Sequence, residues 1–240
     1  MNYKINLILL VTILLNACRE QAENEPDHPS NAAAIPSITY TTVQVYPHDT
    51  NAFTEGLLMH NNKLFESTGA TETLPQTRSL FGILNTQNGR IETKAEIDRS
   101  IYFGEGIAFL NGKVFQLTYK NKIGFIYDAT TFRQCGKFAI PSAEGWGLTT
   151  DGQYLIMSDG SNVLTYLDSS SLKVVKLLRV TENGYAKDQL NELEYIQGSI
   201  YANIWPGTTI VKINPADGAV TGVLDLSALE AEAKRLHAAS

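Results

Sequence analysis

The chain has 240 residues, of which 43% are hydrophobic and 18% are charged, and its formal net charge is −6. This composition is that of an ordinary globular protein, and the length suits one large all-β domain. Because the charge is negative and Lys and Arg do not cluster, the sequence offers no electrostatic footprint for nucleic acid. No Gly-rich nucleotide-binding loop and no Asp/Asn-rich calcium loop is present, so neither a cofactor nor a metal is expected.

Residues 1–17 have the layout of a lipoprotein signal peptide. Lys4 gives a positive start, 5–15 are mostly apolar, and Cys18 follows the small residue Ala17. The pattern resembles a bacterial lipobox, which implies lipid attachment at Cys18. We therefore expect an exported protein anchored by lipid at the bacterial cell envelope, on the periplasmic side or at the outer membrane in a Gram-negative host. The alternative is an ordinary signal peptide with a coincidental cysteine.

Residues 18–36 are polar and contain Pro26, Pro29 and Pro36, so we interpret them as a flexible tether. The folded domain is then expected over 37–240. Cys135 has no partner there once Cys18 is acylated, and we interpret it as a small strand or turn residue.

A repeated pattern dominates the rest of the chain. Each copy opens on a short motif that contains Gly or Glu and continues as an apolar strand, a tight turn and a second strand. The four openings are Glu55–Leu57, Glu105–Ile107, Gly145–Leu148 and Asn191–Glu194. In the second half of each copy an Asn or Asp ends a β-rich run, and these positions are 43, 40 and 46 residues apart. Four short strands per 40–50 residues are typical of a β-propeller blade, whereas chance hairpins of a β-sandwich would not repeat both halves in phase.

The repeats predict blades over roughly 53–98, 103–140, 145–180 and 191–226, with a short helix over 226–236. The alternating segment Thr41–Tyr46 predicts an isolated strand, which we expect to be the outer strand of a fifth blade. The remaining strands of that blade would have to follow residue 226. The alternatives are a ring of four blades or a sequence that lacks its C-terminal portion, and we favour the second.

The motifs along residues 40–226 resemble the plant/bacterial-type glutaminyl-peptide cyclotransferases. The matching segments are Phe53–Leu57, Glu66–Gly69, Phe103–Ile107, Gln116–Lys120, Glu144–Leu148, Ser158–Ser161, Leu190–Tyr195 and Ala202–Trp205. The resemblance implies a five-bladed propeller that converts the N-terminal Gln of peptides or proteins to pyroglutamate with release of ammonia. The partner would be a Gln-bearing N-terminus, and a monomer is expected.

Cyclisation needs a neutral α-amine, stabilisation of an oxyanion and a proton for the departing ammonia. Glu105, between two glycines at the start of an inner strand, is the candidate catalytic proton shuttle, although a carboxylate there could also cap a backbone turn. The resemblance implies that further residues bind the substrate, namely Phe53, Glu55, Phe103, Tyr119, Trp146, Asn191 and Trp205. Of these, Phe103, Trp146 and Trp205 would form an apolar wall, although each Trp could instead pack in the core between blades.

Three positions depart from the family pattern. Glu55 replaces a usual Gln and adds a carboxylate to the expected pocket. Tyr119 replaces a usual Trp. The last-blade segment that carries the family's active-site Lys has no counterpart in the sequence. These departures leave two alternatives open, namely a non-catalytic peptide-binding propeller or an inactive truncated product. A third alternative is a calcium-dependent propeller hydrolase of the lactonase or strictosidine synthase-like kind.

Overall fold

The computed structural model describes residues 34–238, and Cys18 and the predicted signal peptide lie outside this part of the chain. Four antiparallel sheets, each of four strands in chain order, form most of the described structure. We call them the first to fourth blades. The bounds of their strands are β1 Thr54–His60, β2 Lys63–Thr68, β3 Leu80–Leu84 and β4 Ile91–Glu96; β5 Gly104–Leu110, β6 Lys113–Thr118, β7 Ile123–Asp128 and β8 Gln134–Ala139; β9 Leu148–Thr150, β10 Tyr154–Met157, β11 Val163–Asp168 and β12 Val174–Arg179; β15 Leu190–Ile196, β16 Ser199–Ile204, β17 Thr209–Ile213 and β18 Val220–Asp225.

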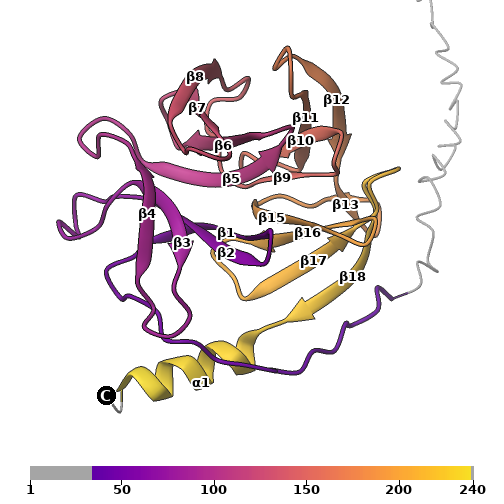
Figure 1. The fold of residues 1–240 in the computed structure, drawn as a ribbon. Helices are drawn as coiled ribbons and strands as arrows, with labels where there is room; N and C mark the ends of the chain where they lie inside the picture. Colours follow the sequence, from indigo (N-terminus) through magenta and orange to yellow (C-terminus); the bar gives the residue numbers. More distant parts are fainter. Residues whose placement is uncertain (1–33, 239–240) are drawn as a thin grey trace, which may run out of the picture. The chain divides into compact units, whose positions relative to one another are not determined.

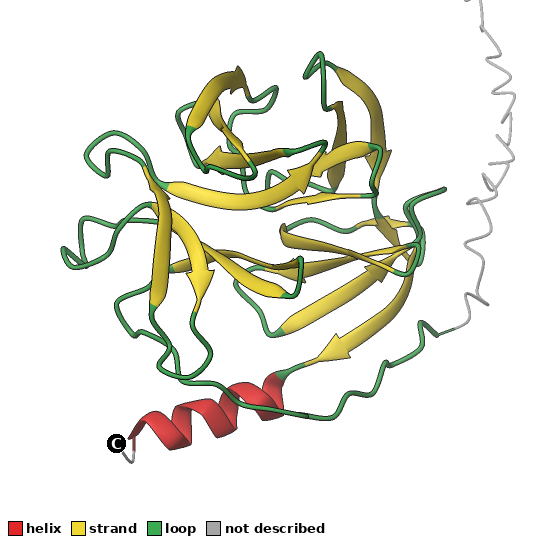
Figure 2. Cartoon of the chain, viewed as in Figure 1, coloured by secondary structure: helices red, strands yellow, loops and turns green. Residues whose placement is uncertain are grey.

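The blades are arranged around an axis lined by their first strands. β1 contacts β5, β5 contacts β9, β9 contacts β15, and β15 in turn contacts β1. Figure 1 shows these four strands toward the middle of the fold, and in Figure 2 most of the regular secondary structure is strand. The structure is therefore a β-propeller of four blades, which confirms the predicted fold class and the four predicted units.

Side chains that alternate along each inner strand build the cores between blades. On β5, Ile107 and Phe109 belong to the apolar cluster shared with the first blade, whereas Ala108 and Leu110 belong to the cluster shared with the third. A further cluster joins the third and fourth blades. Because residues i and i+2 of a strand face the same side, one apolar strand can serve two interfaces.

Glycines allow the inner strands to approach one another closely. A Cβ on Gly106 would lie 2.5 Å from the backbone nitrogen of Leu148, and one on Gly147 would lie 2.2 Å from the carbonyl oxygen of Asn191. The Gly106 N–H also donates a hydrogen bond of 2.9 Å to the carbonyl of Trp146 in the next blade. The glycine of the repeated opening is thus required by backbone contact between neighbouring blades.

The segment of residues 36–49, which precedes β1, makes backbone hydrogen bonds to both the fourth and the first blade. The Ile38 N–H donates to Val223 of β18, the Val223 N–H donates to Pro36, and farther along the Asp49 N–H donates to Gly89. Pro36, which the sequence assigned to the tether, therefore accepts a backbone hydrogen bond from the edge strand β18.

The expectation that Thr41–Tyr46 forms a strand of a fifth blade is wrong. Thr41–Tyr46 forms no strand, and Val43 is 93% exposed. Alternation of β-branched and polar residues favours a strand only where a neighbouring edge offers hydrogen bonds, and this segment pairs with none. Residues 34–238 hold no fifth four-stranded sheet.

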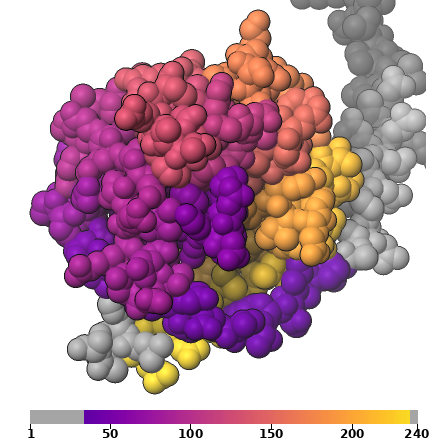
Figure 3. Space-filling model, viewed as in Figure 1, coloured from indigo at the N-terminus to yellow at the C-terminus, as the bar shows by residue number. Residues whose placement is uncertain are grey.

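The side of the first blade that faces the fourth is consequently open. Leu57 and Met59 of β1 are 41% and 64% exposed, whereas the corresponding Ile107 and Phe109 of β5 are buried against the first blade. Figure 3 shows a recess between the dark purple atoms of the first blade and the orange atoms of the fourth.

The helix predicted at the end of the chain is present as α1, Ser227–Ala238, and the Asp225 carboxylate accepts a hydrogen bond from the Ser227 N–H at its start. A short hairpin, β13 Thr181–Glu182 and β14 Tyr185–Ala186, links the third and fourth blades. Within residues 34–238, no helix is long and apolar enough to cross a membrane.

Candidate active site

A cavity of about 260 Å³ lies where the inner strands begin, and it collects every residue that the sequence assigned to catalysis or substrate binding. Its lining consists of Phe53, Glu55, Phe103, Glu105, Tyr119, Trp146, Asn191 and Trp205. The volume is somewhat below the ~300–1,000 Å³ of pockets for drug-sized ligands, and it suits a group the size of one amino-acid residue.

Irregular pairing at the start of the inner strands directs the polar side chains into this cavity. The register between β1 and β2 shifts around Glu55, that between β5 and β6 around Glu105, and that between β15 and β16 around Asn191. An extra residue in one strand bends it and re-aims the side chain beside it. Trp146 lies two residues before β9 and occupies the equivalent position of the third blade.

Two buried serines fix the backbone of these positions from the preceding blade. The Ser67 hydroxyl donates to the carbonyl of Glu105 at 2.6 Å, and the Ser158 hydroxyl donates to the carbonyl of Asn191 at 2.7 Å. The sequence reasoning gave neither serine a role. Ser67 lies near the end of β2 and Ser158 follows β10 directly, and only the contact between blades reveals what the two serines bind.

One wall of the cavity is a row of aromatic rings. Phe103 makes an edge contact with Phe53 at a centroid distance of 5.9 Å and lies 6.0 Å from the Tyr119 ring. The Phe103 ring lies directly over Gly69, where any Cβ would fall 2.1 Å from the ring. The Gly of the motif Glu66–Gly69 therefore makes room for the aromatic wall.

Another part of the lining is formed by two indoles. Trp146 and Trp205 are edge to face with centroids 5.9 Å apart, and Trp205 is 55% exposed at the mouth of the cavity. The Trp146 indole N–H donates to Glu144 at 2.9 Å, and Glu144 also pairs with the exposed Lys120 at 3.7 Å. These contacts fix the orientation of the inner indole.

Glu105 is the most deeply buried acidic group of the cavity, with 5% of the residue exposed. Its carboxylate has no hydrogen-bond donor or cation beside it within residues 34–238. Burial raises the pKa of Glu105 well above its usual range, and the negative charges of Glu55, Glu192 and Glu144 raise it further. An uncompensated carboxyl group in an apolar cavity is the arrangement expected of a general acid or base.

The neighbouring carboxyl groups are also affected by burial. It raises the pKa of Glu55 to about 7 and that of Glu194 to about 7. Burial likewise raises the pKa of Glu192, although its Oε1 accepts a hydrogen bond of 3.2 Å from the Leu57 N–H. In the part of the chain described, no group of three or more His, Cys, Asp or Glu side chains could hold a metal ion.

Comparison with known proteins agrees with this geometry. The family model described as glutamine cyclotransferase matches residues 9–240. The chain belongs to the glutamine cyclotransferase family.

Two members of the glutamine cyclotransferase family are similar to this chain. The glutaminyl-peptide cyclotransferase of Arabidopsis thaliana is 38% identical over 188 residues, which make up 78% of this chain and 57% of that protein. The crystal structure of Myxococcus xanthus glutaminyl cyclase is 33% identical, with a TM-score of 0.68 over 78% of this chain and 76% of that chain. The chain thus spans a little over half the length of the plant relative.

Proposed function

We propose that this protein is a glutaminyl-peptide cyclotransferase, an acyltransferase that converts the N-terminal Gln of a peptide or protein to pyroglutamate and releases ammonia. The observation that supports the activity most directly is the unpartnered Glu105 carboxyl group in a one-residue cavity. The family and the names of the two relatives supply the substrate class.

Glu105 acts in this proposal as the proton shuttle. Its carboxylate accepts a proton from the substrate's α-ammonium, and the freed amine attacks the side-chain carboxamide carbon. As the new C–N bond forms and the old one breaks, a proton passes through Glu105 to the departing nitrogen, which leaves as ammonia. The raised pKa of Glu105 brings its proton affinity closer to that of the amine, so transfer in both directions becomes easier.

The aromatic walls supply the geometry of the reaction. A glutamine side chain must fold back so that its carboxamide carbon approaches its own α-nitrogen, and a narrow apolar cavity favours this compact shape. Phe103 and Trp146 line the cavity, and Asn191 offers an amide group to the carboxamide or to the developing oxyanion.

Turnover of a peptide that begins with Gln tests the activity. The purified protein is incubated at pH 5–9 with this peptide and, as the control, with the same peptide begun by Asn, whose side chain is one methylene shorter. We expect ammonia and a cyclised product from the Gln peptide alone. Absence of ammonia at every pH would overturn the proposed activity.

Binding of peptide N-termini without turnover is the second candidate. It is favoured by one observation, namely that no lysine is among the residues lining the cavity, while the nearby Lys120 already pairs with Glu144. Calorimetric titration with the Gln peptide separates the two functions, because a pure binding protein would take up the peptide and leave it unchanged.

We further propose that the protein is exported and lipid-anchored through Cys18 at the bacterial cell envelope. The support is the sequence pattern of residues 1–18. Labelling of expressing bacteria with a clickable fatty acid should mark the wild-type protein and leave Cys18→Ala unmarked. Equal labelling of both proteins would contradict the anchor.

A further inference from the structure

A second acidic residue enters the cavity from the strand next to that of Glu105. Glu55 and Glu105 each directly precede the glycine at which the inner strands touch, and a Cβ on Gly56 would lie 3.2 Å from the Cα of Gly106. Both side chains line the same cavity, and both stand at a register shift of their strand. The repeat therefore places two carboxyl groups at equivalent positions of adjacent blades.

Neither carboxyl group is neutralised by the protein. Among the described residues, no cation or hydrogen-bond donor faces the carboxylate of Glu55 or that of Glu105, which is itself more than nine-tenths buried. A buried charge without a partner is costly, so such a pair remains protonated in part until a cation enters the cavity. The site is thus complementary to a small cationic group.

Other charged groups lie near the pair, and most of them have partners of their own. Glu144, which comes before β9, is held by Lys120 and by the Trp146 indole. Glu192 and Glu194 of β15 add negative charge from the fourth blade, and Glu192 accepts a hydrogen bond from the Leu57 N–H. In the described structure, Lys120 is the only cation that forms an ion pair with any of these carboxylates, and its side chain is 64% exposed.

We propose that Glu55 is a second acid–base residue, which forms with Glu105 a carboxyl pair that receives the N-terminal ammonium of the substrate. This inference rests on the proposed cyclotransferase function. Two protons must leave the α-nitrogen, since an ammonium becomes a lactam N–H. One carboxylate accepts the first proton before the amine attacks the carboxamide carbon. The pair then transfers the second proton from the ring nitrogen to the departing NH₂, which leaves as ammonia, and the first proton follows to ammonia or to water.

The pair titrates as a unit, because ionisation of either carboxyl group disfavours ionisation of the other. The negative charge of Glu55 contributes to the raised pKa of Glu105. Replacing Glu55 by the isosteric Gln keeps the shape of the cavity and removes that charge. The pKa of Glu105 should therefore fall, and activity should persist to lower pH.

The test compares wild type with Glu55→Gln and with the control Glu72→Gln, which removes an exposed carboxylate outside the cavity. We expect the acid limb of kcat/KM for a Gln peptide to move down by about one pH unit in Glu55→Gln and to stay in place in Glu72→Gln. An acid limb that is unmoved, or that moves to higher pH, would overturn the pair.

The coupling between Glu55 and Glu105 can also be measured without turnover, which separates this test from the test of activity. In protein labelled with ¹³C at the glutamate carboxyl carbon, the NMR signal assigned through Glu105→Gln should titrate at lower pH in Glu55→Gln than in wild type. If Glu55→Gln is inactive, this titration alone decides, and an unchanged Glu105 midpoint refutes the pair. If wild type itself releases no ammonia, the cyclotransferase proposal fails while the titration still measures the coupling.

Discussion

Substitution of Gly106 by Ala should separate the second blade from the third, because the glycine lies where their backbones touch. The new methyl group would lie 2.5 Å from the backbone nitrogen of Leu148 and 2.8 Å from two further backbone atoms, so no side-chain rotation can relieve the overlap. Reaching 3.4 Å, the lower limit of ordinary contact, requires a local retreat of about 0.9 Å.

The size of this backbone displacement determines how much stability the substitution should cost. The Gly106 N–H donates to the Trp146 carbonyl at 2.9 Å, and a shift of this size stretches the bond beyond the ~3.2 Å limit of a good hydrogen bond. Overpacking costs about 1–3 kcal/mol and an unsatisfied buried amide costs about 1–3 kcal/mol. A loss near 3 kcal/mol corresponds to a melting temperature lower by roughly 6–12 °C for a domain of this size.

Differential scanning calorimetry measures the effect, and Gly136→Ala is the matched control. Gly136 also lies in a strand, but its added Cβ would be 3.4 Å from the end of the Ile126 side chain, which is ordinary contact. We expect the control to melt within about 2 °C of wild type, as substitutions outside special sites do. A Gly106→Ala protein that melts like the control would refute the close-contact reasoning.

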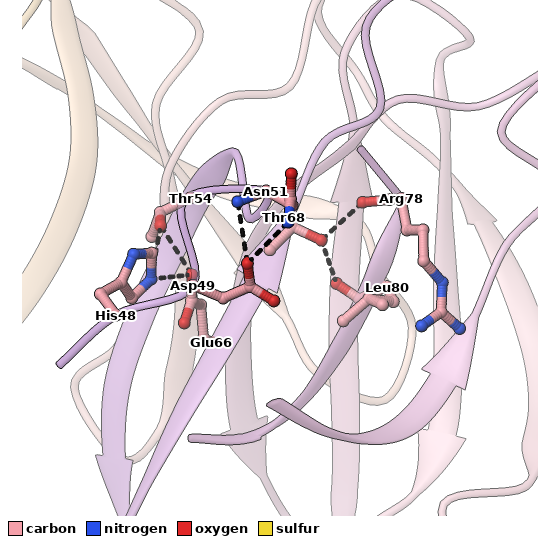
Figure 4. A network of polar contacts seen from close by, with 8 residues as sticks. All are labelled: His48, Asp49, Asn51, Thr54, Glu66, Thr68, Arg78 and Leu80. Atoms are coloured by element: carbon pink, nitrogen blue, oxygen red, sulfur yellow. Dashed lines mark hydrogen bonds and ion pairs between the residues drawn. The ribbon is translucent and has the colours of Figure 1, made fainter. Parts of the chain in front are cut away.

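Three further predictions concern the cavity and its surroundings. Trp205→Ala should raise KM for a Gln peptide about tenfold, which corresponds to the loss of an aromatic contact of about 1.4 kcal/mol. The melting temperature should stay nearly unchanged, because the indole packs edge to face on Trp146 but is 55% exposed. A lower melting temperature without a change in KM would contradict the position of Trp205 at the mouth of the cavity. His48→Ala should reduce the free energy of unfolding by about 1–3 kcal/mol in urea titrations, because the fully buried Glu66 loses a hydrogen-bond partner at 2.8 Å (Figure 4). The double variant His48→Ala/Glu66→Gln should recover part of this loss. Burial raises the pKa of Glu194 from 4.5 to about 7, so between these pH values the unfolded chain loses a proton that the folded chain keeps, and stability falls as pH rises through this window. Glu194→Gln should flatten this fall when urea midpoints at pH 4.5 and pH 8 are compared, and an equally steep fall would exclude Glu194 as its source.

The sequence predicts the blades and the cavity well because both depend on local patterns. The apolar alternation and the tight turns of each unit set its four strands, and equivalent positions of successive units converge on the axis. For this reason Glu105, Trp146 and Asn191 come together although they are about 40 residues apart in the chain.

Features that depend on contacts between blades could not be predicted in the same way. The bonds of Ser67 and Ser158 to the next blade require that the blades be in place first. The segment Thr41–Tyr46 carries a strand pattern but has no edge to pair with, and Pro36 is instead bound to β18. Residue types indicate candidate strands, whereas pairing with a neighbouring strand decides which of the candidates form.

The function of Glu105 is tested most directly by comparing wild type with Glu105→Gln in two measurements on one Gln peptide. Ammonia release gives kcat, and calorimetric titration gives the affinity for the peptide. We predict that Glu105→Gln lowers kcat by at least ~10²-fold, the usual contribution of a general acid–base, while the peptide still binds within about tenfold of the wild-type affinity. A folded Glu105→Gln protein that releases ammonia at the wild-type rate would contradict the account.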